Sequence, residues 1–300
     1  MLYAVIDIGS NAVRLLFANA QLIENEIVVE KATLIRIPLR LGIDAFTIGK
    51  ISLNRKVDFV KTMQAFQLLI DVYKPQEYCA LATAAMREAA NSIEILNEVK
   101  EKVGMDIKII SGREEASIIR STNKLEIMGS SNPVIFIDVG GGSTDISVEI
   151  DGHLIKLKSF KIGTLRILND SYPKNIWKEI FSWLQFLKDD YEQVFCVGSG
   201  GNINKINKLY GDSESKILAK SNLLSSYNYL NSLTIEERMS KFGFREDRAD
   251  VIVPAAEIYL KILDFLNVES IIVPKIGLAD GMVHILYEKH LKKISKAKIQ

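Results

Sequence analysis

The pattern of apolar and polar residues predicts a β-hairpin in the middle of the chain. Residues 134–137 (VIFI) form a continuous apolar run that is typical of a buried strand, and the run ends in Asp138. Residues 146–150 (ISVEI) alternate between apolar and polar and are typical of a second strand. Three glycines at 140–142 separate the two runs and favour a tight turn over helix or strand.

The same pattern occurs once more, at the start of the chain. Residues 3–8 (YAVIDI) are an apolar strand that contains Asp7 and is followed by Gly9, and residues 12–18 (AVRLLFA) continue as a second strand. The segment IDIGS at 6–10 parallels IDVGG at 137–141. This weak internal repeat predicts two related halves, each with one hairpin.

The remaining patterns predict an α/β protein with two domains. Residues 26–37 extend the first hairpin to about three antiparallel strands, and residues 40–42 follow as a loop. Ser52 is the expected cap of a helix to Tyr73, with a buried stripe of Val57, Val60, Phe66 and Leu69. Thr234 to Glu237 matches a capping box. The second hairpin and a third strand are expected within 134–161. Further strands are expected at 78–84, 106–110, 194–197 and 270–274, and further helices at 92–103, 112–127, 163 onward, 176–187, 203–209, 250–266 and 283–300.

The best linker signal is GSSNP at 129–133, so we expect domains at 1–128 and 129–300. The final helix, about 283–300, could pack back on the first domain. Two tryptophans in the helix at 176–187 are expected in the core.

Composition excludes several classes of function. The chain has 300 residues, 48% of them hydrophobic, and a formal net charge of +1, so there is no global attraction to nucleic acid or membrane. We expect no secretory signal and no membrane span. Cys79 and Cys196 lie alone in apolar runs, which predicts buried free thiols and a reducing, cytoplasmic location. The three histidines lack zinc-type spacing.

The two hairpins carry groups that suit a phosphate together with a hard cation. Backbone N–H groups of a glycine turn and the hydroxyls of Ser143 and Thr144 can hold phosphate oxygens, and the carboxylates of Asp138 and Asp145 can hold a metal ion or its water. The alternative is a glycine-rich hairpin whose aspartate caps its own turn. A third glycine loop, residues 198–202 (GSGGN), comes before a helix and is a further candidate ligand contact.

These residues resemble the exopolyphosphatase/guanosine pentaphosphate phosphohydrolase (Ppx/GppA) family of the actin-like ATPase superfamily, over almost the whole chain. Residues 7–16 (DIGSNAVRLL) resemble its first phosphate motif and residues 111–116 (SGREEA) its Ser-Gly-x-Glu-Glu-Ala segment. Residues 138–145 and 198–201 resemble its second phosphate motif and third glycine loop. The resemblance implies two actin-like (ribonuclease H-like) domains with mixed sheets flanked by helices and a ligand cleft between them.

The resemblance also implies a metal-assisted release of terminal phosphate from polyphosphate, oligophosphate or guanosine pentaphosphate. Glu115 would be the general base, and Asp138, Asp145 and Asp7 would hold Mg²⁺ or another divalent cation. The phosphate-binding residues would be Ser10, Asn11, Arg14, Arg87, Gly140, Gly141, Gly142, Ser143, Gly200 and Gly201. A plain helix-dipole role for Glu115 and a surface ion pair for Arg87 remain alternatives.

Three features depart from the family pattern, and the first two motivate a rival hypothesis, a sensor that binds nucleotide or polyphosphate without hydrolysis. Asp145 stands where the family has Glu, and Ala279 replaces an Arg in the late Gly-Leu-Arg-Glu-Gly motif, here residues 277–281. The chain also stops near residue 300, so it resembles the short members of the family and we expect short substrates. An actin-like ATPase is a third hypothesis, and a homodimer is left open.

Overall fold

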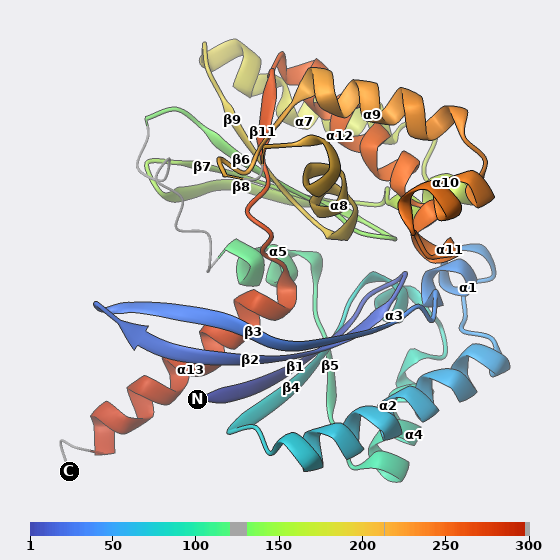
Figure 1. The fold of residues 1–300 in the computed structure, drawn as a ribbon, viewed down its shortest axis with the longest axis vertical. Helices are drawn as coiled ribbons and strands as arrows, with labels where there is room; N and C mark the ends of the chain where they lie inside the picture. The colour runs from blue at the N-terminus through green and yellow to red at the C-terminus, as the bar shows by residue number, and fades with distance from the viewer. Residues whose placement is uncertain (121–130, 213, 298–300) are drawn as a thin grey trace. The chain divides into compact units, whose positions relative to one another are not determined.

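The computed structural model describes residues 1–120, 131–212 and 214–297. The chain divides into two compact units, residues 1–123 with 276–300 and residues 124–275 (Figure 1). The predicted domain boundary at 128/129 and the predicted end of a helix near residue 127 lie outside the described residues. Both therefore stay predictions.

The first unit is built on a five-stranded mixed sheet with the order β3-β2-β1-β4-β5. β1 pairs antiparallel with β2 and β2 antiparallel with β3, as the sequence predicted, while β1, β4 and β5 run parallel. The strands are β1 Leu2–Ile8, β2 Val13–Ile23, β3 Glu26–Ile37, β4 Glu77–Ala82 and β5 Ile107–Ile109.

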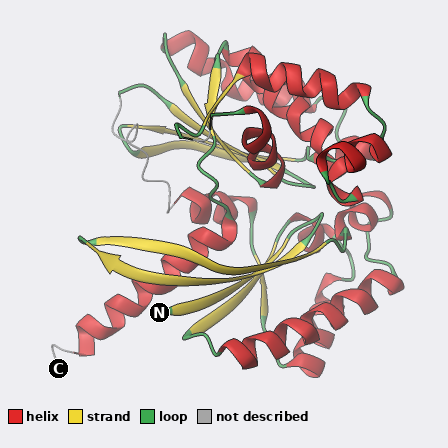
Figure 2. Cartoon of the chain, viewed as in Figure 1, coloured by secondary structure: helices red, strands yellow, loops and turns green. Residues whose placement is uncertain are grey.

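Helices cover both faces of this sheet (Figure 2). Successive side chains of β1 point to opposite faces, and each face has its own apolar core to be covered. Ala4, Ile6 and Ile8 belong to the core that also contains Phe59 and Phe66 of α2. Tyr3 and Val5 face the opposite side and pack against α13. The helices of this unit are α1 Leu41–Thr47, α2 Leu53–Tyr73, α3 Ala84–Glu88, α4 Ser92–Val103, α5 Gly112–Arg120 and α13 Leu278–Ala297.

The second unit repeats the strand order of the first. Its six-stranded sheet runs β10-β11-β9-β6-β7-β8, so β8-β7-β6-β9-β11 corresponds to β3-β2-β1-β4-β5, with the same antiparallel and parallel pairings. This shared topology confirms the two related α/β halves predicted from the short sequence repeat. The strands are β6 Val134–Val139, β7 Thr144–Ile150, β8 His153–Phe160, β9 Phe195–Ser199, β10 Ile217–Ala219 and β11 Ser270–Ile272.

One large hydrophobic core joins this sheet to its helices. The predicted tryptophans, Trp177 and Trp183, pack against that core, and Thr234 and Glu237 form the predicted capping box. The helices are α6 Thr164–Leu168, α7 Ile176–Asp190, α8 Gly201–Tyr210, α9 Lys220–Ser232, α10 Ile235–Phe242, α11 Glu246–Ala249 and α12 Ile252–Leu266. Among the described residues, no helix is both long enough and apolar enough to cross a bilayer.

Several local predictions were wrong. The segment 40–42 is not only loop, since Leu41 is fully buried and begins α1. Val57 was placed on the buried stripe of α2, but its side chain is 42% exposed, and Phe59, Met63 and Ile70 are the buried positions beside Val60 and Phe66. Ser52 precedes α2 without a capping hydrogen bond from its side chain. The helix expected at 250–266 begins only at Ile252, after the short α11.

Candidate functional site

The first hairpin turn is a four-residue loop, Gly9 to Ala12, closed by a hydrogen bond from the N–H of Gly9 to the carbonyl oxygen of Ala12 (3.1 Å). Ser10 is buried, and its carbonyl oxygen accepts from the N–H of Gly42 (2.8 Å). The carbonyl oxygen of Asn11 accepts from the N–H of Arg40 (3.0 Å). The connection from β3 to α1 therefore holds the predicted phosphate residues Ser10 and Asn11 in a fixed loop.

A row of three charged residues crosses β1, β2 and β3 next to this turn. Asp7 is in register with Arg14, and Arg14 with Arg36, so the three side chains share one face of the sheet. Arg14 Nη1 donates to Asp7 Oδ2 at 2.6 Å. Two of the predicted residues therefore bind each other, with Asp7 orienting the guanidinium of Arg14. Arg36 was not predicted, because the strand register that places it beside Arg14 is not visible in the sequence.

Arg87 lies on α3, directly after the end of β4. Its Nη1 donates to the carbonyl oxygen of Ile110 (2.8 Å), the residue just before the segment that opens α5. Thr83, at the start of α3, donates its hydroxyl to the carbonyl oxygen of Ile8 (3.3 Å). The structure thus ties the first hairpin, α3 and the start of α5 together within one unit.

The two adjacent acids of α5 have different surroundings. Glu114 accepts from the N–H (2.9 Å) and the hydroxyl (3.1 Å) of Ser111, and its own N–H donates to the Ser111 hydroxyl, which is the pattern of a capping box. The N–H of Ser111, the ammonium of Lys108 and the Ser111 hydroxyl lower the pKa of Glu114 to about 2. Glu114 therefore caps the helix, and its neighbour Glu115 is half-buried and takes no part in this capping box.

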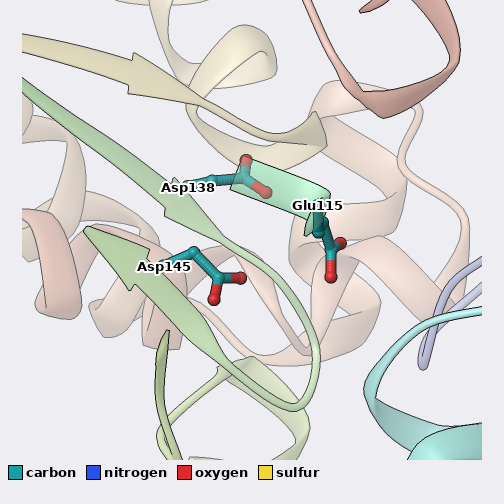
Figure 3. Close-up of side chains that lie close together, drawn as sticks. All are labelled: Glu115, Asp138 and Asp145. Atoms are coloured by element: carbon teal, nitrogen blue, oxygen red, sulfur yellow. The ribbon is translucent and has the colours of Figure 1, made fainter. Parts of the chain in front are cut away.

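The second hairpin brings two carboxylates together. Asp138 on β6 is in direct register with Asp145 on β7, so both side chains lie on the same face of the sheet (Figure 3). Asp145 is 3% exposed and accepts from the hydroxyl of Ser143 (3.3 Å). Asp138 accepts from the hydroxyl of Ser199 (2.6 Å). Like charges directly opposite each other are unfavourable, so this pair favours a bound cation.

The start of α6 is hydrogen-bonded to the backbone of the glycine turn of this hairpin. The carbonyl oxygens of Gly140 and Gly141 accept from the N–H groups of Thr164 (3.0 Å) and Leu165 (2.9 Å). A Cβ on Gly163 would lie 2.6 Å from the backbone of Gly141, so only glycine fits there. The buried Arg166 adds a bond from its Nε to the carbonyl oxygen of Gly142 (2.7 Å). The sequence placed a helix start here but gave no sign of this contact.

The third glycine loop lies beside the second hairpin, since β9 runs parallel to β6. Gly200 has φ +115°, a conformation that favours glycine, and a Cβ on it would lie 3.0 Å from the carbonyl oxygen of Val139 and 3.5 Å from Asp138 Oδ1. Gly201 begins α8. Beneath the loop, the hydroxyl of the fully buried Tyr259 donates to the carbonyl oxygen of Ser199, and burial raises the pKa of Tyr259 well above its usual value.

The residues of the second hairpin fit a hard divalent cation. The donor set consists of two facing carboxylates with two serine hydroxyls beside them, and all of these are oxygen ligands of the kind that Mg²⁺ prefers. Within the second unit, the predicted residues Asp138, Asp145 and Ser143 therefore come together. In the first unit, Asp7 instead holds Arg14.

The sequence is similar to the proteins of one known family. The model of the Ppx/GppA phosphatase family matches residues 34–290. The chain belongs to this family. A curated guanosine-5′-triphosphate,3′-diphosphate pyrophosphatase of Aeromonas salmonicida is 25% identical over 94% of this chain, and exopolyphosphatase 1 of Mycobacterium bovis is 23% identical, also over 94%.

Solved structures of similar proteins cover nearly the whole chain and confirm the predicted fold class. The Aquifex aeolicus PPX-GPPA enzyme is 26% identical, with a TM-score of 0.70 over 95% of this chain and 99% of its own. An exopolyphosphatase from Cytophaga hutchinsonii has a TM-score of 0.80 at 18% identity, over 96% of this chain and 98% of its own. The chain spans about three fifths of the length of the curated pyrophosphatase relatives (59% and 60%), and 87% of the mycobacterial one.

The position at which the family motif has an arginine lies inside the first unit. Ala279 is 8% exposed and packs with Tyr3 and Val5 against the sheet. Asp280, beside it, binds Lys31 (2.9 Å) and accepts from the N–H of Gly277 (3.0 Å). In this Ppx/GppA chain, residues 277–281 therefore anchor α13 on the sheet.

Proposed function

We propose that this Ppx/GppA protein is a phosphohydrolase that releases the terminal phosphate from inorganic polyphosphate, oligophosphate or guanosine pentaphosphate. The observation that carries the proposal is the facing pair Asp138–Asp145 beside a clasped glycine turn, in a chain of the Ppx/GppA phosphatase family. Family relatives carry the names exopolyphosphatase and guanosine-5′-triphosphate,3′-diphosphate pyrophosphatase.

In the proposed reaction, Glu115 takes a proton from a water molecule, and the water oxygen attacks the terminal phosphorus in line with the anhydride bond. That P–O bond breaks, and its electron pair leaves with the shortened phosphate chain. Glu115 is supported in this role because the neighbouring acid, Glu114, is held in the helix cap by Ser111.

Backbone N–H groups and hydroxyls would hold the phosphates. On the second unit these are the turn Gly140, Gly141, Gly142 and Ser143, and the loop with Gly200 and Gly201. On the first unit they are Ser10 and Asn11, with Arg14 and Arg87 supplying positive charge. Two features support a phosphate-binding role for Arg14. Asp7 fixes the orientation of its guanidinium, and its side chain is 32% exposed and so accessible to a ligand.

Asp138 and Asp145 would hold Mg²⁺ or another divalent cation, directly or through water. The ion, when bound, would neutralise developing charge on the phosphate oxygens. Asp7 was predicted as a third ligand, but its bond to Arg14 favours an orienting role. We propose a cytoplasmic location because both cysteines are free thiols. Cys196 is buried as predicted, whereas Cys79 is half-buried, and burial raises the pKa of each to about 12.

The proposal is tested by phosphate release from polyphosphate, guanosine pentaphosphate and ATP, measured side by side for the wild type and Glu115→Gln. We expect release from at least one of the first two substrates, and a loss of about 10²–10⁴-fold in Glu115→Gln with ligand binding retained. Asp145 and Ala279 favour one alternative, a sensor, and binding without release from any substrate would establish it. Release from ATP alone would identify an ATPase.

A further inference from the structure

Two helices of the first unit touch at a glycine that the catalytic proposal does not use. Gly281, on α13, lies so close to α5 that a Cβ built on it would be 2.1 Å from the carbonyl oxygen of Ile118 and 2.8 Å from its carbonyl carbon. Real Cβ atoms essentially never come within 3.0 Å of such an atom. Only glycine therefore allows the two helices to approach this closely.

The two helices are held to the unit very differently. α13 has 20 residues and is anchored along the sheet by Val283, Leu286 and Tyr287, by the edge-to-face contact of Tyr287 with Tyr3, and by the Lys31–Asp280 ion pair. α5 has nine described residues and rests on α13 and the sheet through Ile118 and Ile119. A group inserted at the contact would therefore displace α5 rather than α13.

Glu115 lies on α5, three residues before Ile118 and one residue after the capping Glu114. Because a helix moves as a rigid body, a shift at Ile118 is passed to the Glu115 carboxylate less than one turn away. Relief of the contact from 2.1 Å to 3.0 Å needs a displacement of roughly 1 Å. Displacements of about that size can cost a hundredfold in rate when a reacting group is misplaced.

We propose that Gly281 is a positioning residue for Glu115, which sets the position of α5 by direct contact of the two helix backbones. The inference rests on the proposed function, in which Glu115 activates water. It assigns the final glycine of the Gly-Leu-Ala-Asp-Gly segment to the placement of the general base and not to contact with phosphate.

Gly281→Ala is the test, and Gly277→Ala is the matched control, because a Cβ on Gly277 meets nothing closer than a side-chain oxygen of Asp280 at 3.8 Å. We expect Gly281→Ala to lower kcat at least tenfold with KM within twofold of wild type. Gly277→Ala should stay within twofold in both. Alanine is favoured over glycine inside a helix, so an unobstructed site would instead give unchanged kcat and a higher Tm.

A double variant shows whether Gly281 acts through Glu115. If it does, Gly281→Ala combined with Glu115→Gln should be no slower than Glu115→Gln alone. A further tenfold loss in the double variant would overturn the inference, as would wild-type kcat in Gly281→Ala.

Amide hydrogen exchange gives a readout that does not depend on hydrolysis. In Gly281→Ala, faster exchange should be confined to residues 112–120, with α2 and β1 unchanged. If the wild type hydrolyses none of the substrates, the proposed function fails, and this measurement still decides whether Gly281 sets α5. Faster exchange across the whole unit, or none in α5, would contradict the inference.

Discussion

The two hairpins have the same backbone arrangement but differ in the charged residues that face each other across their strands. In each, the last but one residue of the first strand is an aspartate, the turn has four residues, and one hydrogen bond closes the turn, Gly9 to Ala12 in the first and Gly140 to Ser143 in the second. The residue opposite the aspartate is Arg14 in the first hairpin and Asp145 in the second. In the first hairpin the two facing charges therefore neutralise each other, whereas the two facing carboxylates of the second favour a bound cation.

The surroundings of the two turns differ as well. The first turn is held by the loop that leads into α1, through bonds to backbone oxygens of Ser10 and Asn11. The second is clasped by Gly163, the first turn of α6 and the buried Arg166. In the function that we propose, the second hairpin would hold the metal ion, and Arg14 of the first hairpin would supply a positive charge whose orientation Asp7 fixes.

Among changes to the two hairpins, the largest effect is expected when one charge is removed from the second. Asp138→Asn and Asp145→Asn should each lower turnover about a hundredfold at fixed Mg²⁺, because amide oxygen is a poorer ligand for a hard cation. Activity should recover in part as the cation concentration rises. A titration of activity against Mg²⁺ checks this. Full wild-type activity in excess chelator would contradict the assignment of a metal ion to this hairpin.

Gly163→Ala, next to the second turn, should disturb that turn more than Gly9→Ala or Gly140→Ala, inside the two turns, disturb their own. The Cβ contact distances are 2.6 Å for Gly163, 3.0 Å for Gly9 and 3.3 Å for Gly140. We expect KM to rise roughly tenfold or more in Gly163→Ala, by less in Gly9→Ala and least in Gly140→Ala, since the first displaces phosphate-binding N–H groups. The three KM values, measured with one substrate, check the order.

Removal of a charge from the first hairpin should act on stability and not on cation dependence. Asp7→Asn breaks the bond to Arg14, and we expect a loss of about 1–2 kcal/mol in the free energy of unfolding, with the exposed part of Arg14 taken into account. KM should also rise, because Arg14 loses its fixed orientation. Urea denaturation and a Mg²⁺ titration test this, and a shifted Mg²⁺ midpoint would return Asp7 to the metal site.

The smallest effect is expected for Asp145→Glu, which restores the acid of the family pattern. The change keeps the charge and adds one methylene, so turnover should stay within about threefold of wild type or rise. Steady-state kinetics at saturating Mg²⁺ provide the measurement. A collapse of turnover would mean that the buried surroundings of Asp145 are built around the shorter acid.

The sequence predicted those parts of the fold that depend on local pattern. Both hairpins, the third strand of each half and the Thr234 capping box follow from alternation, glycine turns and capping residues, all of which act over a few residues. The errors occurred where distant packing decides. Val57 fits a helical stripe as well as Phe59 does, and only the position of the sheet determines which one is buried.

The candidate site divides in the same way. Residues within one motif, such as Asp138, Asp145 and Ser143, could be predicted because a hairpin brings its own two strands together. The partners supplied by other segments could not, and these include Arg36 beside Arg14, Ser199 on Asp138 and Arg166 beneath the glycine turn. Each depends on strand register or helix placement, which a single sequence does not encode in any short stretch.

The place of α13 in the first unit has a consequence for how the protein is made. Residues 124–275 form a continuous unit, whereas the first unit needs residues from both sides of it. On a ribosome, the second unit can be complete while one face of β1 and β2, with Tyr3, Val5 and Leu16, still awaits α13. During synthesis, the chain therefore exposes an apolar sheet surface until residues 278–297 have left the ribosome.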